Sequence, residues 1–186
     1  MINPTKWPVV ILSNYRTGSS ALALKLSSDN SVPCFVEPHV NSERQAAFFS
    51  VYGKHDKYIV KFMPDQLSLF SAYKDLLESD CYLIKLQRKN IVEQIASFYL
   101  ALIRDKWWTK ENDVETDYFI PIKTDLIKQS CERILTTETL LNNYNSVNQT
   151  LYYEDLGIFE DIDRKHSLKP KNMNRLLDVI KNNVSR

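Results

Sequence analysis

Short apolar runs alternate with longer segments of helical periodicity along most of this chain. The apolar runs cover residues 9–12, 32–36, 58–63, 81–86 and 150–153. Near-continuous runs of this kind are typical of strands that are buried on both faces of a parallel sheet. The segments between them place apolar residues on one helical face, and they predict helices over 41–52, 66–78, 90–107, 122–144 and 172–182.

This alternation predicts an α/β fold with a mainly parallel sheet of four or five strands and helices on both faces. Residues 27–31 are expected to form a polar connection, and residues 110–121 a surface loop or lid. No repeat, low-complexity tract or linker rich in Gly and Ser divides the chain. We therefore expect residues 1–186 to form a single domain.

Residues 9–22 predict a P-loop-like strand, loop and helix around which the other elements are arranged. The loop has the sequence Arg16-Thr17-Gly18-Ser19-Ser20. The first turn of the following helix offers unpaired N–H groups and the positive end of the helix dipole. Gly18 lets the backbone approach a ligand, and the hydroxyls and the guanidinium add donors. The loop is therefore predicted to bind an anion.

Two common phosphate-binding motifs do not fit this loop. A nucleoside-triphosphatase loop reads G-x-x-x-x-G-K-[ST], and a dinucleotide fingerprint needs three glycines within six residues. The whole chain has only three glycines, and none completes either pattern. Another class of anionic ligand is expected.

The charge balance and the cysteines limit the classes of partner and ligand that the protein is expected to bind. The 24 basic residues nearly cancel the 23 acidic ones, so no global field favours nucleic acid or an anionic membrane. Cys34, Cys81 and Cys131 lack metal-ligand spacing, which indicates reduced thiols and no structural metal. No signal peptide or membrane-spanning run is found, so we expect a soluble, cytoplasmic protein with a small-molecule partner.

A second candidate anion-binding group follows the fourth strand. Arg88 comes at the predicted carboxyl edge of the sheet, where open α/β folds bind ligands, and a guanidinium can fork onto a phosphate. The next helix has an apolar stripe and a second stripe of polar or small residues, Gln94, Ser97, Ala101 and Arg104. The second stripe is expected to face a ligand.

These two segments resemble the binding motifs of the sulfotransferases that use 3′-phosphoadenosine 5′-phosphosulfate (PAPS). The first loop resembles the family's 5′-phosphosulfate loop, and Arg88 with Ser97 resembles its 3′-phosphate motif. Glu37-Pro38 and Tyr153-Glu154-Asp155-Leu156 match two further motifs in the right order. The nine positions from Arg88 to Ser97 are similar to the bacterial sugar sulfotransferase branch.

The resemblance implies roles for individual residues. Arg16, Thr17, Gly18, Ser19 and Ser20 would hold the 5′-phosphosulfate, with Arg16 stabilising the leaving group, and Arg88 and Ser97 would hold the 3′-phosphate. No metal is implied. The family's late Arg-Lys-Gly loop has no clear match, so Lys169 or Lys171 is the candidate for it, with a solvated lysine as the alternative.

The transfer reaction also needs a general base and an acceptor pocket. Glu37 is the expected base, held extended by Pro38 beside the loop strand, and His39 is its competitor. Lys61 interrupts an apolar strand and either contacts the sulfuryl group or reaches solvent along its aliphatic stem. The aromatic wall for the acceptor is expected from Trp107, Trp108, Tyr118 and Phe119.

The acceptor is expected to be a small hydroxyl compound such as a carbohydrate, with PAP as the nucleotide product. Because the chain is shorter than most of the family, a homodimer is the candidate for completing the pocket. Two other readings stay open. One is a nucleotide or small-molecule kinase, and the other is a non-catalytic nucleotide-binding protein of the same fold.

Overall fold

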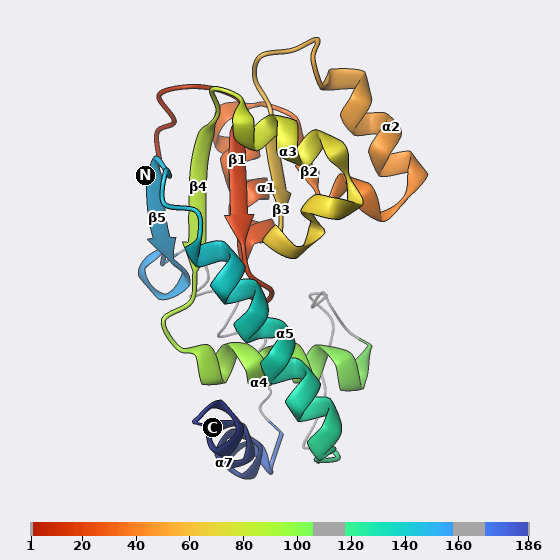
Figure 1. The fold of residues 1–186 in the computed structure, drawn as a ribbon, viewed down its shortest axis with the longest axis vertical. Coiled ribbons are helices and arrows are strands. Elements are labelled where there is room, and N and C mark those ends of the chain that lie inside the picture. The colour runs from red at the N-terminus through yellow and green to blue at the C-terminus, as the bar shows by residue number, and fades with distance from the viewer. Residues whose placement is uncertain (1, 106–117, 158–169, 186) are drawn as a thin grey trace.

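The computed structural model describes residues 2–105, 118–157 and 170–185 (Figure 1). Its sheet has five strands, all parallel, in the order β2-β3-β1-β4-β5. The strands are β1 (Val9–Ser13), β2 (Cys34–Val36), β3 (Ile59–Phe62), β4 (Tyr82–Gln87) and β5 (Gln149–Tyr152). The predicted α/β class and parallel sheet are confirmed.

The described helices follow the predicted alternation. They are α1 (Ser19–Asn30), α2 (Ser42–Val51), α3 (Ser71–Glu78), α4 (Ile91–Arg104), α5 (Thr124–Asn142) and α7 (Met173–Val184). Three short 3₁₀ helices follow the carboxyl ends of strands: η1 (Pro38–Val40), η2 (Pro64–Leu69) and η3 (Tyr153–Asp155). In the described part of the chain, no helix is both long and apolar enough to cross a bilayer.

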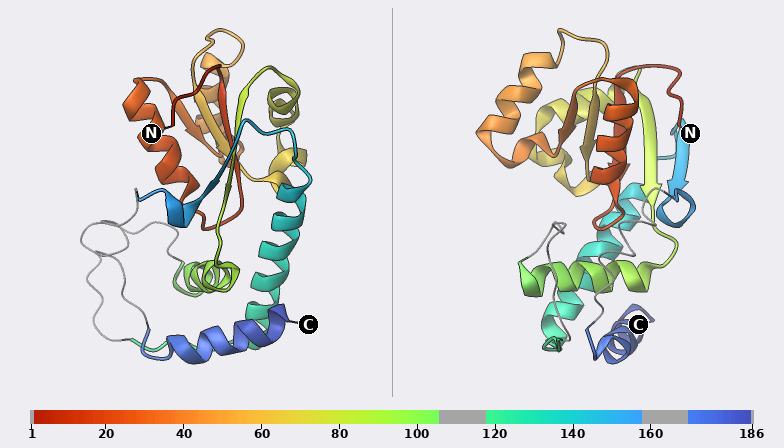
Figure 2. Two further views of the ribbon diagram at one scale, coloured as in Figure 1. Left: turned by 90° about the vertical axis from the view of Figure 1, so that its left-hand side faces the viewer. Right: turned by 180° about the vertical axis from the view of Figure 1, so that it is seen from behind.

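The central strand β1 is buried on both faces, as a near-continuous apolar run requires. Val9 and Ile11 pack in one apolar cluster with Leu22 and Leu26 of α1. Val10 and Leu12, which point the other way because side chains alternate along a strand, pack in the cluster that contains residues of α2 and α3. Helices therefore cover both faces of the sheet, as predicted (Figure 2).

A third apolar cluster lies beyond the carboxyl edge of the sheet, where α4, α5 and α7 pack together (Figure 1). Helix α5 connects it to the sheet. Its residues Ile127 and Ile134 belong to this third cluster, whereas Leu141, two turns further on, belongs to the cluster on the sheet. The position of α5 therefore fixes how α4 stands relative to the strand ends.

Two predicted boundaries were wrong. The helix expected over 66–78 is divided into η2 and α3 at Phe70, whose φ of −153° is extended. This break lets the Phe70 ring pack against Phe48 and Tyr73, at centroid distances of 5.6 and 5.0 Å. The polar connection expected over 27–31 is instead helical to Asn30, and Ser31 ends the helix in a left-handed conformation with its N–H on the carbonyls of Ser27 and Ser28.

Phe48 provides a test of the packing on the α2 and α3 face. Its ring is fully buried, and its alanine variant leaves a cavity among Phe35, Tyr52 and Phe70. We expect Phe48→Ala to lower the free energy of unfolding by about 3–5 kcal/mol in urea denaturation. The neighbouring Phe49, 45% exposed, is the matched control, and Phe49→Ala should cost far less. Equal losses would contradict this assignment of the core.

Candidate functional site

The loop between β1 and α1 is a tight turn with two left-handed residues. Arg16 has a φ of 57° and Gly18 a φ of 72°. The glycine adopts this conformation without cost, whereas Arg16 is strained there by about 1 kcal/mol or more. No side chain among the described residues caps the amino end of α1, so its first N–H groups point out of the turn. A strained, open helix end of this kind suits an anion.

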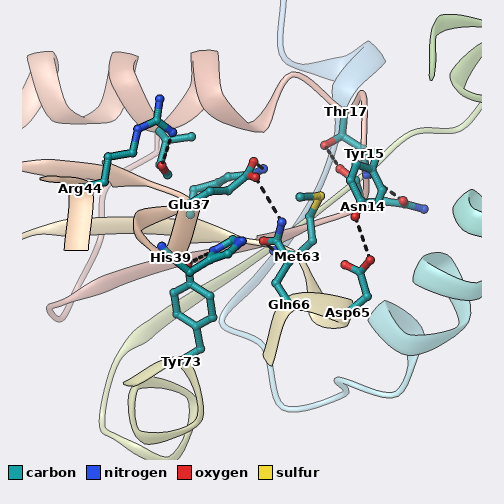
Figure 3. Close-up of polar contacts among 12 residues, drawn as sticks. Asn14, Tyr15, Thr17, Glu37, His39, Arg44, Met63, Asp65, Gln66 and Tyr73 are labelled. Carbon is teal, nitrogen blue, oxygen red and sulfur yellow. Dashed lines mark hydrogen bonds and ion pairs between the residues drawn. The ribbon is translucent and has the colours of Figure 1, made fainter. Parts of the chain in front are cut away.

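Asn14 holds this strained loop in place. Its amide Nδ2 donates to the carbonyl of Ile134 and to Oε2 of Glu138, each at 2.9 Å. Its Oδ1 accepts from the N–H of Tyr15 at 2.7 Å, and its carbonyl accepts from the hydroxyl of Thr17 at 3.0 Å (Figure 3). The Thr17 hydroxyl is therefore used within the loop, which leaves the N–H of Thr17 as its donor for the predicted ligand.

The two segments singled out in the sequence meet at the loop. Nε of Arg16 donates to Oγ of Ser97 at 3.0 Å, and Nη1 of Arg88 donates to the carbonyl of Arg16 at 3.4 Å. Gln94, one turn before Ser97 on α4, donates to the carbonyl of Tyr15 at 2.6 Å. Gln94 and Ser97 of the polar stripe therefore face the loop, whereas Arg104 lies on the ring of Tyr118. Arg16, Arg88 and Ser97 lie together, next to Ser19 and Ser20 at the start of α1.

The two guanidinium groups concentrate positive charge in this part of the molecule. Burial lowers the pKa of Arg16, and the charge of Arg88 lowers it further. The Arg88 side chain is only 14% exposed, and its Nε is buried without a hydrogen bond. An anion bound between the two groups would relieve their mutual repulsion.

The segment after β5 positions Arg88. The ring of Tyr153 lies 4.7 Å from the Arg88 guanidinium carbon, and Glu154 lies 3.6 Å from its Nε. Glu154 also accepts from the N–H groups of Lys89 and Asn90, at 2.9 and 3.2 Å, and so holds the turn from β4 into α4. Burial alone would raise the pKa of Glu154, but these N–H groups and Arg88 lower it. The Tyr-Glu-Asp-Leu motif thus acts on the site through Arg88.

Glu37 is at the carboxyl end of β2, but its backbone is not extended. Its φ of 48° and ψ of 61° are left-handed, which the residue before a proline seldom adopts, so the extended conformation that was predicted is wrong. Three contacts hold it there. Its N–H donates to the carbonyl of Lys61 at 2.8 Å, and its carboxylate binds Lys61 and Gln66. Tertiary contacts have overridden the local preference.

The Glu37 carboxylate forms an ion pair with Lys61, which is itself 3% exposed. Oε1 lies 2.6 Å from the lysine Nζ, and Oε2 accepts from Gln66 at 3.1 Å (Figure 3). Burial alone would raise the pKa of Glu37, but the charge of Lys61 and the two hydrogen bonds lower it. Because β3 separates β2 from β1, Glu37 borders the loop strand only across Lys61. The lysine does not extend into solvent along its stem.

His39, the other candidate base, belongs to the same group of residues. Its Nδ1 lies 2.7 Å from the hydroxyl of Tyr73. Burial lowers the pKa of His39, although the charge of Glu37 opposes the shift. The imidazole is therefore neutral at neutral pH. Within the described residues, no three His, Cys, Asp or Glu side chains come together as a metal site would require.

Lys171, the carboxyl-terminal candidate that the structure describes, lies apart from the loop. The N–H of Lys171 donates to the carbonyl of Tyr118 at 3.0 Å, and its Nζ is 6.0 Å from the ring of Phe119. This segment leads into α7, on the side of α4 that faces away from the sheet (Figure 1). Phe119 is 71% exposed, and Tyr118 lies under Arg104. Trp107, Trp108 and Lys169 lie outside the described residues.

Sequence reasoning missed several residues that shape the site. Asn14 directly follows a strand. That position could have identified it as a site residue, because the ends of strands border ligand sites. Gln66 and Glu138 gave no such signal. Tyr15 and Asp65 were also missed, although the Tyr15 hydroxyl donates to Oδ2 of Asp65 at 2.8 Å beside the loop.

The ion pair of Glu37 with Lys61 predicts a pH-dependent stability. Glu37→Gln leaves the buried lysine without its counter-charge, so we expect a loss of about 3–5 kcal/mol at pH 7 in urea denaturation. The folded-state pKa of Glu37 is lowered, so its contribution is complete above the unfolded value of about 4.3 and is lost progressively as the pH falls from there through the lower folded-state pKa. The difference between Glu37→Gln and the parent should therefore shrink at about pH 3.5.

Two control variants complete this test. Glu43→Gln removes an exposed carboxylate and should change stability by no more than about 0.5 kcal/mol. Glu37→Gln combined with Lys61→Met removes both charges and should recover much of the loss. A Glu37→Gln penalty that is unchanged in acid, or that persists in full in the double variant, would refute a stabilising ion pair.

Comparisons with known proteins add no family to this picture, because no protein-family model matches the chain and no curated protein matches it in a sequence search.

Proposed function

We propose that this protein is a PAPS-dependent sulfotransferase, which transfers a sulfuryl group to a hydroxyl of a carbohydrate or another small acceptor. The observation that carries the proposal is the meeting of Arg16, Ser97 and Arg88 at the uncapped amino end of α1. These residues come from two sequence segments, each of which resembles a PAPS-binding motif by itself. Their contact supports the resemblance independently of the motifs.

The ligand expected at this site has two separate anionic groups. The 5′-phosphosulfate would lie on the N–H groups from Thr17 to Ser20 and on Arg16, and the 3′-phosphate on Arg88 and Ser97. The two residues are in contact, since Nη1 of Arg88 donates to the carbonyl of Arg16 at 3.4 Å. A kinase would need a lysine and glycines that this loop lacks.

The chain supplies groups for each part of the transfer. Donors at the loop would stabilise the negative charge that develops on the leaving phosphate as the S–O bond breaks. A carboxylate or an imidazole would take the proton from the acceptor hydroxyl as the new S–O bond forms. Glu37 is ionised at neutral pH and His39 is neutral, so each is in the form that accepts a proton.

The contacts that the Glu37 carboxylate already makes favour a second candidate function. Both of its carboxylate oxygens are already bound, to Lys61 and to Gln66, and its pKa is lowered. A carboxylate held in this way is a weak base. A nucleotide-binding protein without transferase activity would keep the arginine site and use Glu37 only to neutralise Lys61.

The nucleotide site is tested by binding of PAP, the expected product. PAP should raise the melting temperature of the parent protein, and ATP with Mg²⁺ should not. Arg16→Ala and Arg88→Ala each remove a charge-assisted contact of roughly 1.5–3 kcal/mol, so PAP affinity should fall by about 10–100-fold in titration calorimetry. Lys25→Ala removes an exposed charge from the same helix and is the control. Stabilisation by ATP and Mg²⁺ alone, or unchanged PAP affinity in both folded arginine variants, would refute the proposal.

The base is tested by turnover. Glu37→Gln keeps the size of the side chain but removes its basicity, so transfer of radiolabelled sulfate from PAPS should fall by about 10²–10⁴-fold with nearly unchanged PAP affinity. The assay is run at a temperature where circular dichroism shows the variant folded. His39→Asn is the comparison, and a large loss confined to it would assign the role to His39. Absence of transfer by the parent protein, despite PAP binding, would favour the non-catalytic alternative.

A further inference from the structure

We infer that Tyr73 fixes the proton of the neutral His39 imidazole on Nε2, so that His39 donates a hydrogen bond to the acceptor hydroxyl and is not the general base. This inference rests on the proposed function and decides between its two candidate bases. Tyr73 is then a positioning residue, because it acts on the reaction only through His39.

The Tyr73 side chain on α3 has a fixed place in the core. It is fully buried, and its ring stacks on that of Phe62 in β3, with the centroids 4.0 Å apart and the planes 8° apart. Its hydroxyl lies 2.7 Å from Nδ1 of His39 and accepts from the backbone N–H of His39 at 3.5 Å (Figure 3). In the described part of the chain, both hydrogen bonds of this hydroxyl are therefore with His39.

A count of donors and lone pairs decides the tautomer of His39. A phenol hydroxyl has one proton to donate, and the backbone N–H of His39 uses only a lone pair of its oxygen. Among the described residues, Nδ1 is the acceptor that remains for the hydroxyl proton. If Nδ1 carried the imidazole proton, the hydroxyl proton would be buried without an acceptor, which is costly. We therefore assign the Tyr73 hydroxyl as the donor to Nδ1, which leaves the imidazole proton on Nε2.

This tautomer removes His39 from the candidate bases. A neutral imidazole has one nitrogen that can accept a proton, and here that nitrogen, Nδ1, is already bound by Tyr73. Taking up a proton there would break the hydrogen bond from the hydroxyl. The pKa of His39 is lowered by burial, which agrees with an imidazole that stays neutral.

Nε2 of His39 is accessible to a ligand beside Glu37. It makes no hydrogen bond within the described residues, and it is not among their buried, unpaired polar atoms. The charged groups that act on the imidazole are Glu37 at the end of β2, Lys61 of β3 and Asp65 of η2. The N–H of Nε2 and the carboxylate of Glu37 therefore lie within electrostatic reach of each other.

A hydroxyl bound between these two groups uses its proton and both of its lone pairs. Glu37 would take the proton while one lone pair forms the new S–O bond. The bridging S–O bond of PAPS would break, and its electron pair would leave with the phosphate. The second lone pair would accept from Nε2–H, which aims the attacking lone pair at the sulfur. His39 keeps its proton throughout, so the step needs no further reactant.

The tautomer is tested by ¹H–¹⁵N NMR of the imidazole nitrogens in the full ¹⁵N-labelled chain at pH 7, without substrates. The chain has three histidines, and His39→Gln identifies the signals of His39 by their loss. We expect a protonated Nε2 and an unprotonated Nδ1. A parent spectrum with the proton of His39 on Nδ1 would overturn the inference.

The role of Tyr73 is tested in Tyr73→Phe, which removes the hydroxyl and keeps the ring. Nδ1 is then free to take a proton, so we expect a fraction of the Nδ1–H tautomer and a titration of His39 at higher pH than in the parent. The three charges around the imidazole are unchanged in this variant. Tyr58→Phe removes another tyrosine hydroxyl from the same apolar cluster and should leave the His39 signals as they are. An unchanged His39 spectrum in Tyr73→Phe contradicts the positioning role.

The donor role is tested by transfer of radiolabelled sulfate from PAPS to a mixture of glucose, glycerol and 4-nitrophenol, which serve as hydroxyl probes. A glutamine amide reaches the position of Nε2, whereas an asparagine amide reaches only that of Nδ1. We therefore expect His39→Asn to lower turnover at least about 10-fold more than His39→Gln, with unchanged PAP affinity in both. Turnover in His39→Gln that is no higher than in His39→Asn would overturn the donor role.

Failure of the proposed function gives a different result. If the parent protein does not bind PAP or transfers no sulfate, the donor role is refuted together with the proposed function. The NMR spectra still decide the tautomer of His39 and the effect of Tyr73 on it, because they need neither nucleotide nor acceptor.

Discussion

A fully buried amide, that of Asn14, is the interaction on which the geometry of the site depends. Its side chain joins the end of the central strand to Ile134 and Glu138 of α5, and it also fixes Tyr15 and, through its carbonyl, Thr17. Leaving such buried groups unpaired would cost about 1–3 kcal/mol each, so the loop and α5 are held in one arrangement. Because α5 also packs on α4, the same contact sets where Ser97 stands.

Several charged side chains lie near the carboxyl edge of the sheet, and those that are buried need a counter-charge. Lys61 is matched by Glu37, Arg133 by Asp65, and Arg88 by Glu93 and Glu154 at longer range. The first two pairs are close, at 2.6 Å, whereas the two contacts of Arg88 are 3.4 and 3.6 Å. The charge of Arg88 is therefore less closely compensated than that of Lys61 or Arg133. The anion site that we propose there is local, in a chain whose formal net charge is only +1.

The proposed roles follow the order of elements around this edge. The loop after β1 and the turn after β4 would hold the nucleotide, and the turns after β2 and β3 supply Glu37 and Asp65. Tyr15 links these parts, since it precedes Arg16 and donates to Asp65. Parallel strands make this possible because all of their carboxyl ends lie at one edge.

The sequence by itself determined the elements and the fold class. Apolar runs and helical spacing are local properties, and they predicted the parallel sheet and the strand, loop and helix around Gly18. The sequence also singled out Arg16 and Arg88 from their positions after strands, and Ser97 from the polar stripe of the helix that follows Arg88. It could not supply the strand order, the break at Phe70 or the left-handed Glu37, because each is decided by packing against residues far away in the chain.

Only the tertiary structure decided which of these residues share contacts. It joined Arg16 to Ser97 and Glu37 to Lys61, and it brought Arg133 to Tyr15. The physical reason is that a side chain's burial can be read from its local pattern, but its partner cannot. Lys61 was recognisable as a costly buried charge, whereas its neutralisation by Glu37 required β2 to pair with β3 in one register.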